Sequence, residues 1–218
     1  MLAQCTDAPL DNASFRWLSA QQIKVAGHAV WAFRMSYSGE LGWELHIPRA
    51  QALAVYDALW KAGKVHGIAD YGSFAMNAMR MEKAFKGAGE LNNEVTLPEA
   101  DVMRFVKLDK AYLGVEATRK SAAGDLPWVC TYLEIEPDGV NDGHGGEPVL
   151  VNGKKVGSTA SVAYSHTCNK ILAFAFIKPQ AAQPGTEVEV VIAGEPRAGR
   201  ILADAVYDPE NKRPRMDR

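Results

Sequence analysis

The sequence contains little cysteine and no long hydrophobic run. Its 218 residues include three cysteines, which form neither a CxxC pair nor a Cys/His pattern at metal-ligand spacing: Cys5, Cys130 and Cys168. Neither a disulfide scaffold nor a metal site is therefore expected, and a reducing compartment, the cytoplasm, is the predicted location. No apolar run approaches the roughly 18 residues of a membrane-spanning helix, and no secretory signal is recognisable, so no membrane segment is predicted.

The sequence also lacks a strong excess of charge of either sign. With 24 Lys and Arg residues against 26 Asp and Glu residues, the formal net charge is -2. No basic stripe is interleaved with aromatic residues, so nucleic acid is not expected as a partner. The one basic cluster is the KRPR segment at 212–215, which is expected to be solvated.

Two common catalytic motifs are absent as well. No G-x-S-x-G elbow is present, which argues against a serine nucleophile of that type. No G-x-G-x-x-G follows a predicted strand, so no nucleotide or flavin site is predicted within these residues. His144 and His166 are isolated histidines in predicted loops, and we interpret them as structural or solvent-facing.

The rest of the composition is that of an ordinary globular protein, with 47% hydrophobic and 23% charged residues. The first part of the chain has strand patterns at 22–25, 29–35 and 43–47. Helical patterns follow at 50–63, where the apolar stripe is broad, and at 68–85. Together they predict an antiparallel sheet with two covering helices.

The texture of the sequence changes after a cluster of glycine, aspartate and proline at 124–127, which is the predicted domain boundary. Short strand patterns then follow at close spacing, and Asn152-Gly153 is a strong β-hairpin signal. Such spacing favours a β-sandwich or a small barrel. We therefore predict an α+β protein, with the sheet and helices in residues 1–124 and a small antiparallel β-barrel in residues 125–218.

The stretch RMSYSGELGWELHIP, which begins at Arg34, contains the candidate site. Gly39 and Gly42 are expected to supply the positive φ angles of a tight reversal between two strands. Beyond them, the residues alternate as in a half-buried strand. The alternation predicts Trp43, Leu45 and Ile47 on a buried face, and Glu44 and His46 on the other. The second face then holds either a ligand site or, as the alternative, ordinary solvated side chains.

This stretch resembles the signature of the aminomethyltransferase (glycine cleavage T-protein) folate-binding family. Its longer form is more similar to the C-terminal region of dimethylglycine and sarcosine dehydrogenases. The helix MNAMRME from Met76, the segment GAGELNNEVTLP from Gly87 and YDPEN from Tyr207 resemble the same family. The resemblance covers nearly the whole chain.

The resemblance implies roles for three residues. In that family the glutamate that closes the signature binds the pterin, and the tyrosine at its start lines the same pocket; these positions are Glu44 and Tyr37 here. A carboxylate can accept both the ring N–H and the exocyclic amine of a reduced pterin in a fork. Arg80, in the helix that resembles the family's R-L-E helix, is the third candidate for cofactor binding. Its alternative role is that of an exposed helical arginine that steadies the fold.

The resemblance also implies a tetrahydrofolate-dependent transfer of a one-carbon unit. The unit would come from an aminomethyl substrate, or from a methylated glycine oxidised by an upstream domain or a flavin oxidoreductase partner. The family's acid/base aspartate lies upstream of the signature, and the start of this chain reads like a cut through a longer one, so no catalytic residue is assigned. The alternative function is that of a non-catalytic folate-binding module, or of a structural or docking module.

Overall fold

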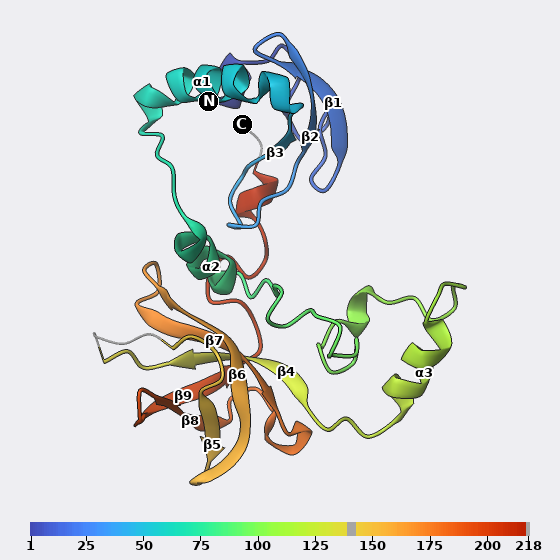
Figure 1. Cartoon of the computed structure of the whole chain (residues 1–218), viewed down its shortest axis with the longest axis vertical. Helices are drawn as coiled ribbons and strands as arrows, with labels where there is room; N and C mark the ends of the chain where they lie inside the picture. Colours follow the sequence, from blue (N-terminus) through green and yellow to red (C-terminus); the bar gives the residue numbers. More distant parts are fainter. Residues whose placement is uncertain (139–142, 217–218) are drawn as a thin grey trace. The chain divides into compact units, whose positions relative to one another are not determined.

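The computed structural model describes residues 1–138 and 143–216. The chain divides into two compact units, which we call unit 1 (Met1–Met76 and Asp208–Arg218) and unit 2 (Asn77–Tyr207) (Figure 1). This division differs from the predicted domains 1–124 and 125–218. The difference arises because the segment after residue 77 packs on the barrel, while the C-terminal segment returns to unit 1.

Unit 1 is built on a three-stranded antiparallel sheet of order β1-β2-β3. Its strands are β1 (Ala20–Val25), β2 (His28–Phe33) and β3 (Glu44–His46). Ala26 and Gly27, both with positive φ, form the turn between β1 and β2. The predicted antiparallel sheet is thus confirmed.

Helix α1 (Ala52–Gly63) lies against one face of this sheet (Figure 1). Its completely buried residue Val55 belongs to the core of unit 1, together with Leu2, Phe15, Ile23, Val25, Val30 and Ala32. The predicted apolar stripe is only partly covered, since the Leu53 side chain is 72% exposed. The core therefore lies between α1 and one face of the sheet.

Unit 2 contains a closed antiparallel barrel of order β4-β7-β6-β5-β8-β9. Its strands are β4 (Val129–Ile135), β5 (Pro148–Val151), β6 (Lys154–Ser165), β7 (Lys170–Ile177), β8 (Glu187–Ile192) and β9 (Glu195–Leu202). Asn152 and Gly153 both have positive φ, as the turn between β5 and β6 requires. Closure removes the exposed strand edges, and the predicted small barrel is confirmed.

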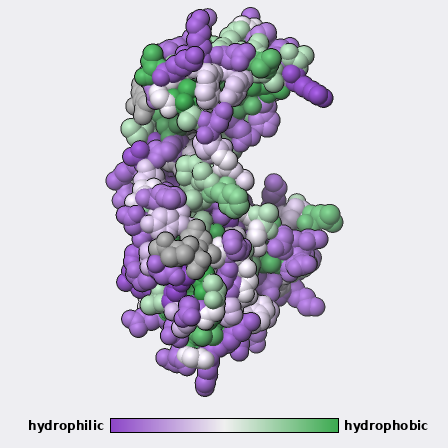
Figure 2. Space-filling view, turned by 60° about the vertical axis from the view of Figure 1, so that its left-hand side comes forward, coloured by the Kyte–Doolittle hydropathy of each residue, from purple (hydrophilic) through white to green (hydrophobic). Residues whose placement is uncertain are grey.

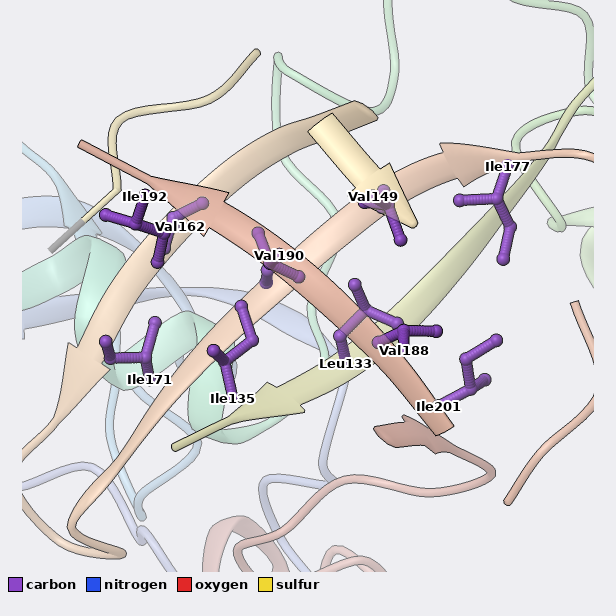
Figure 3. Close-up of a cluster of buried hydrophobic side chains, with 12 residues drawn as sticks. Leu133, Ile135, Val149, Val162, Ile171, Ile177, Val188, Val190, Ile192 and Ile201 are labelled. Atoms are coloured by element: carbon purple, nitrogen blue, oxygen red, sulfur yellow. The ribbon is translucent and has the colours of Figure 1, made fainter. Parts of the chain in front are cut away.

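The barrel interior is filled by aliphatic side chains from all six strands (Figure 3). The residues buried in this core are Leu133, Ile135, Val149, Val162, Ile171, Ala173, Ala175, Ile177, Val188, Val190, Ile192 and Ile201. β-Branched residues predominate, as expected for packing on a pleated surface. The interior is thus a packed core.

Helix α2 (Ser73–Glu82) ends against the outside of this barrel. The Tyr132 hydroxyl donates to the Met81 carbonyl oxygen at 2.7 Å, and Met81 is completely buried beside Leu172 and Phe174. Helix α3 (Val115–Ala123) is the one α-helix in the following segment among the described residues. The predicted boundary near residue 124 therefore lies within unit 2.

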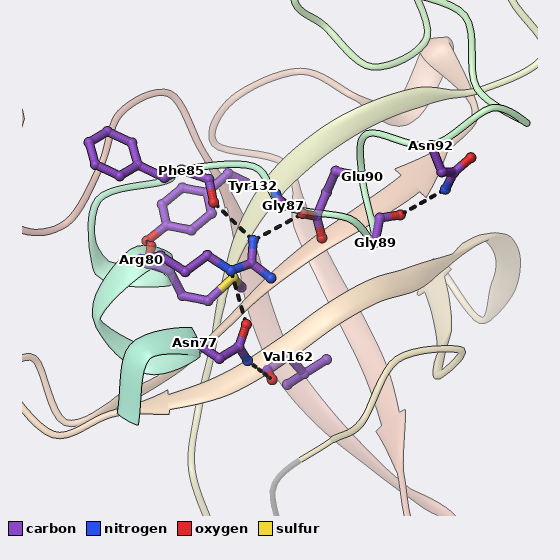
Figure 4. Close-up of polar contacts among 10 residues, drawn as sticks. Asn77, Arg80, Phe85, Gly87, Gly89, Glu90, Asn92, Tyr132 and Val162 are labelled. Carbon is purple, nitrogen blue, oxygen red and sulfur yellow. Dashed lines mark hydrogen bonds and ion pairs between the residues drawn. The ribbon is translucent and has the colours of Figure 1, made fainter. Parts of the chain in front are cut away.

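A buried ion pair joins α2 to the segment that follows it (Figure 4). Arg80 donates from Nη1 to Glu90 Oε2 and to the Phe85 carbonyl oxygen, both at 2.9 Å, and from Nε to Asn77 Oδ1 at 2.9 Å. Glu90 Oε2 also accepts the Gly87 backbone N–H at 2.6 Å. The Arg80 side chain is 6% exposed and that of Glu90 is 0% exposed. The pair therefore fixes a segment with little regular secondary structure.

A second carboxylate, that of Glu147, accepts hydrogen bonds from residues directly before β5 and from β6. Its oxygens accept the backbone N–H groups of His144 (2.6 Å) and Gly145, and the Thr159 hydroxyl. Burial by itself would raise the pKa of Glu147, but these hydrogen bonds to the ionised form outweigh it and lower the pKa below its ordinary value of 4.5. These residues are thus tied to a charged carboxylate.

The three basic residues of the KRPR cluster are exposed, as predicted, and the segment also makes contacts within unit 1. Arg213 Nε donates to both oxygens of Glu40, at 2.7 and 2.9 Å. The Arg215 guanidinium lies 4.4 Å from the centre of the Trp17 ring, and Pro214 is buried. These contacts join residues that are far apart in the sequence, so they cannot be predicted from the composition of the segment alone.

Hydrophilic residues cover most of the face drawn in Figure 2, with hydrophobic residues in small groups between them. No helix in the described part of the chain is long and apolar enough to cross a membrane. Within residues 1–138 and 143–216, no three His, Cys, Asp or Glu side chains are arranged to hold a metal ion.

We expect Glu90→Gln to destabilise the protein strongly. The substitution keeps the shape of the side chain but leaves the buried Arg80 charge without its counter-ion, a loss of about 3–5 kcal/mol. The measurement is thermal unfolding, with Glu116→Gln as the matched control, because Glu116 pairs with Arg119 at the surface and such pairs contribute about 1 kcal/mol or less. Equal melting temperatures for the two variants would contradict the structural role of the pair.

We expect the stabilisation by Glu147 to depend on pH. Because folding lowers its pKa, the contribution is fully present above about pH 4.5 and is lost as the pH falls through the lower folded-state value. Glu147→Gln should lower the unfolding free energy by about 1–2 kcal/mol at pH 7. The difference from wild type, measured by urea unfolding, should shrink as the pH falls below about 4.5. Glu189→Gln, at an exposed position on β8, is the control; a pH-independent difference for Glu147→Gln would refute the assignment.

Candidate functional site

The segment between β2 and β3, residues 34–43, is held by a buried arginine. Arg34 is 1% exposed; its Nη1 donates to the Phe15 carbonyl oxygen at 2.5 Å, and its Nη2 to the Met216 carbonyl oxygen at 3.0 Å. Its guanidinium also lies 5.5 Å from the centre of the Trp43 ring. Arg34 therefore fixes the chain directly before β3 against the core of unit 1.

The glycine corner is longer than predicted. Of its two glycines, Gly39 has a positive φ (80°), but Gly42 is not among the residues with positive φ. The hydroxyls of Ser36 and Ser38 are hydrogen bonded to each other at 2.9 Å. Arg213 donates to both carboxylate oxygens of Glu40 and so links this connection to the C-terminal segment. The prediction of a tight reversal is wrong, since these contacts support a connection that spans residues 34–43.

Strand β3 confirms the predicted alternation. Trp43, Leu45 and Ile47 pack against the core of unit 1, whereas Glu44 and His46 are exposed. Glu44 Oε1 and His46 Nε2 lie 2.6 Å apart, and the two side chains are 59% and 56% exposed. A carboxylate and an imidazole are thus paired on the outer face of the sheet.

Two aromatic residues of β2 share this face, and the sequence reasoning did not single them out. Phe33 pairs with Glu44 across the strands, and Trp31 pairs with His46. Trp31 is 51% exposed. The centres of the Phe33 and His46 rings lie 4.6 Å apart. The alternation in the segment HAVWAF could have predicted this, because Val30 and Ala32 are the buried residues of the strand, and Trp31 and Phe33 therefore point to the other face.

The three predicted site residues fall in both units. Glu44 is on β3, and Tyr37 lies in the 34–43 connection of unit 1 with its side chain 44% exposed. Arg80 belongs to unit 2, where Glu90, Asn77 and the Phe85 carbonyl oxygen occupy its guanidinium. The alternative of an exposed helical arginine is wrong, since Arg80 is 5% exposed. Cofactor binding by these residues stays a prediction.

The outer face of the sheet keeps a hydrogen-bond acceptor beside aromatic side chains. Among the described residues, only His46 makes a hydrogen bond to the Glu44 carboxylate, and each carboxylate oxygen has two acceptor lone pairs. Glu44 Oε2 and one lone pair of Oε1 remain available, beside the flat side chains of Trp31 and Phe33. A planar heteroaromatic ring with adjacent N–H donors on one edge matches an acceptor flanked by aromatic surface.

Family models match both parts of the chain. Residues 1–110 match the GCVT N-terminal domain, and residues 130–208 match the glycine cleavage T-protein C-terminal barrel domain. The second match coincides with the closed barrel of unit 2. The limits of the two matches, 110 and 130, lie on either side of the predicted boundary at 124.

Similar proteins extend the comparison over the whole chain. Mitochondrial dimethylglycine dehydrogenase of Homo sapiens is 37% identical over 100% of this chain and 25% of its own length. Mitochondrial sarcosine dehydrogenase of Mus musculus is 32% identical over 98% of the chain and 24% of its own length. Aminomethyltransferase of Thermoanaerobacter sp. (strain X514) is 29% identical, over 98% of this chain and 58% of that protein. The chain therefore spans about a quarter of the two dehydrogenases.

A solved structure supports the fold. The glycine cleavage system aminomethyltransferase T from Bartonella henselae superimposes with a TM-score of 0.75 at 19% identity, covering 83% of this chain and 50% of that one. Both family-specific domains are matched, and together they account for most of the sequence. The chain belongs to the glycine cleavage T-protein family, with the GCVT N-terminal domain in its first part and the C-terminal barrel domain in its second.

Proposed function

We propose that this chain binds tetrahydrofolate and takes part in a one-carbon transfer. The observation that carries the proposal is the exposed carboxylate of Glu44, which keeps acceptor capacity next to the aromatic side chains of Trp31 and Phe33. Membership of the T-protein family and the similarity to an aminomethyltransferase support it.

Glu44 has the central role in this proposal. Its carboxylate accepts the two adjacent N–H donors of the pterin edge, and these charge-assisted hydrogen bonds orient the ring. Tyr37, which is exposed, adds an aromatic ring and a hydroxyl to the proposed site. Tetrahydrofolate, when bound, supplies the nitrogen that accepts the one-carbon unit. Arg80 is paired with Glu90 in unit 2, and its contact with the cofactor stays a prediction.

The substrate and the partner follow from the relatives. Proteins similar to this chain are named for dimethylglycine, sarcosine and aminomethyl groups. We therefore propose an aminomethyl compound or a methylated glycine as the source of the carbon, with a flavin oxidoreductase domain or partner as its supplier.

The three cysteines are free, in keeping with the proposed reducing, cytoplasmic location.

A second candidate function is folate binding without transfer. The strands of the sheet contain one carboxylate, Glu44, and no aspartate. General acid–base catalysis needs a positioned group that moves a proton and contributes about 10²–10⁴-fold. The outer face of the sheet thus provides a ligand for the pterin, and the catalytic proton donor would come from elsewhere.

We expect Glu44→Gln to weaken tetrahydrofolate binding roughly tenfold or more, because a charge-assisted hydrogen bond of about 1.5–3 kcal/mol is lost. The measurement is isothermal titration calorimetry under anaerobic, reducing conditions. Glu189→Gln, at an exposed position of the barrel, should bind as wild type does. An unchanged affinity of a folded Glu44→Gln variant, or no binding by the folded wild type, would refute the proposal.

A further inference from the structure

On the outer face of the sheet, Phe33, His46 and Glu44 contact one another, and the proposed function does not use the contacts of His46. The Phe33 ring lies 4.6 Å from the His46 ring, inclined at 45°. His46 Nε2 lies 2.6 Å from Glu44 Oε1. Phe33 is also the cross-strand partner of Glu44. The imidazole is thus bounded by an aromatic ring and a carboxylate.

This geometry determines which atom carries the proton. An ionised carboxylate can only accept, so Nε2 of His46 donates to Oε1 of Glu44. The bond is charge-assisted and short, as such bonds are. It therefore opposes the free rotation that a glutamate with an exposed side chain otherwise has.

Other polar groups on this face do not replace His46. Lys24 lies on β1 opposite Ala29, and Gln22 lies opposite Trp31, so β2 separates both residues from Glu44. Of the described residues, His46 alone is hydrogen bonded to the Glu44 side chain. The orientation of the carboxylate thus depends on one neighbour.

Orientation matters for an exposed glutamate. Ordering such a side chain costs up to about 1.5–2 kcal/mol of rotamer entropy, and a fork of two hydrogen bonds needs both oxygens in the plane of the ligand edge. A side chain that is already held loses less entropy when the ligand binds. A neighbouring residue that holds Oε1 in place and leaves Oε2 available therefore orients the carboxylate for two hydrogen bonds to the ligand.

We infer that His46, supported by the ring of Phe33, is a positioning residue that orients Glu44 toward a heteroaromatic ring with two adjacent N–H donors on its edge. This inference rests on the proposed function and assigns His46 a part in ligand recognition. His46 acts through Glu44 and makes no contact with the ligand.

A double-mutant cycle on the full 218-residue chain tests the inference. Tetrahydrofolate binding is measured by calorimetry for wild type, His46→Leu, His46→Gln, Glu44→Gln and the double variant His46→Leu/Glu44→Gln. His46→Leu should weaken binding roughly three- to tenfold, whereas His46→Gln, which restores an N–H donor, should stay within about twofold of wild type. In the Glu44→Gln background, His46→Leu should have no further effect.

A truncated ligand provides the control for indirect effects. The p-aminobenzoylglutamate part of folate lacks the donor edge, so any affinity that it has should be the same for wild type and His46→Leu. Equal losses for His46→Gln and His46→Leu, or additive losses in the double variant, would overturn the inference.

A readout without folate separates this inference from the proposed function. Nitrogen-15 NMR of His46 should show Nε2 as the protonated nitrogen in wild type, with a weaker preference in Glu44→Gln. If folate does not bind but the preference is found in wild type and weakens in Glu44→Gln, the proposed function fails and the positioning geometry stands. If folate binds and the preference is absent in wild type, the role of His46 is refuted.

Discussion

A guanidinium that is removed from water needs hydrogen-bond acceptors, and in each unit a buried arginine obtains them from residues outside the regular secondary structure. Arg34 obtains its acceptors from the carbonyl groups of Phe15 and Met216. Arg80 obtains them from the Phe85 carbonyl group and the Glu90 carboxylate. A buried polar or charged group is costly unless it is hydrogen bonded, so these contacts hold the neighbouring loops to the two arginines.

The arrangement in unit 1 has a direct consequence for the candidate site. Arg34 begins the 34–43 connection, and its guanidinium contacts Trp43, which comes directly before β3. Trp43 faces the core, so the strict alternation of a strand places Glu44 on the other face. A slip of one residue would bury the carboxylate and expose the tryptophan. The anchor at Arg34 thus sets the face on which Glu44 is presented.

Sequence patterns predicted the features that depend on neighbours in the chain. Alternation identified the outward Glu44 and His46, Asn152-Gly153 identified a hairpin, and regular strand spacing identified the barrel. Patterns of this kind are local, so they do not reveal partners that are distant in sequence. The contact of Arg213 with Glu40 joins residues 173 positions apart, and the composition of the KRPR segment does not predict it. Likewise, the burial of Arg80 depends on Glu90 and on the barrel, and helical periodicity alone does not show it.

The carboxylates of the chain differ in their exposure and in how many acceptor lone pairs remain available to a ligand. Glu90 is completely buried with Arg80, and Glu82, 5% exposed, accepts from Ser165 and Thr167. Glu44, in contrast, is more than half exposed and has one described partner, His46. A carboxylate that is already enclosed by donors stabilises the fold but cannot reach a ligand. Recognition needs one that is held in place and still has free lone pairs, and on the sheet of unit 1 the pairing with His46 meets both conditions.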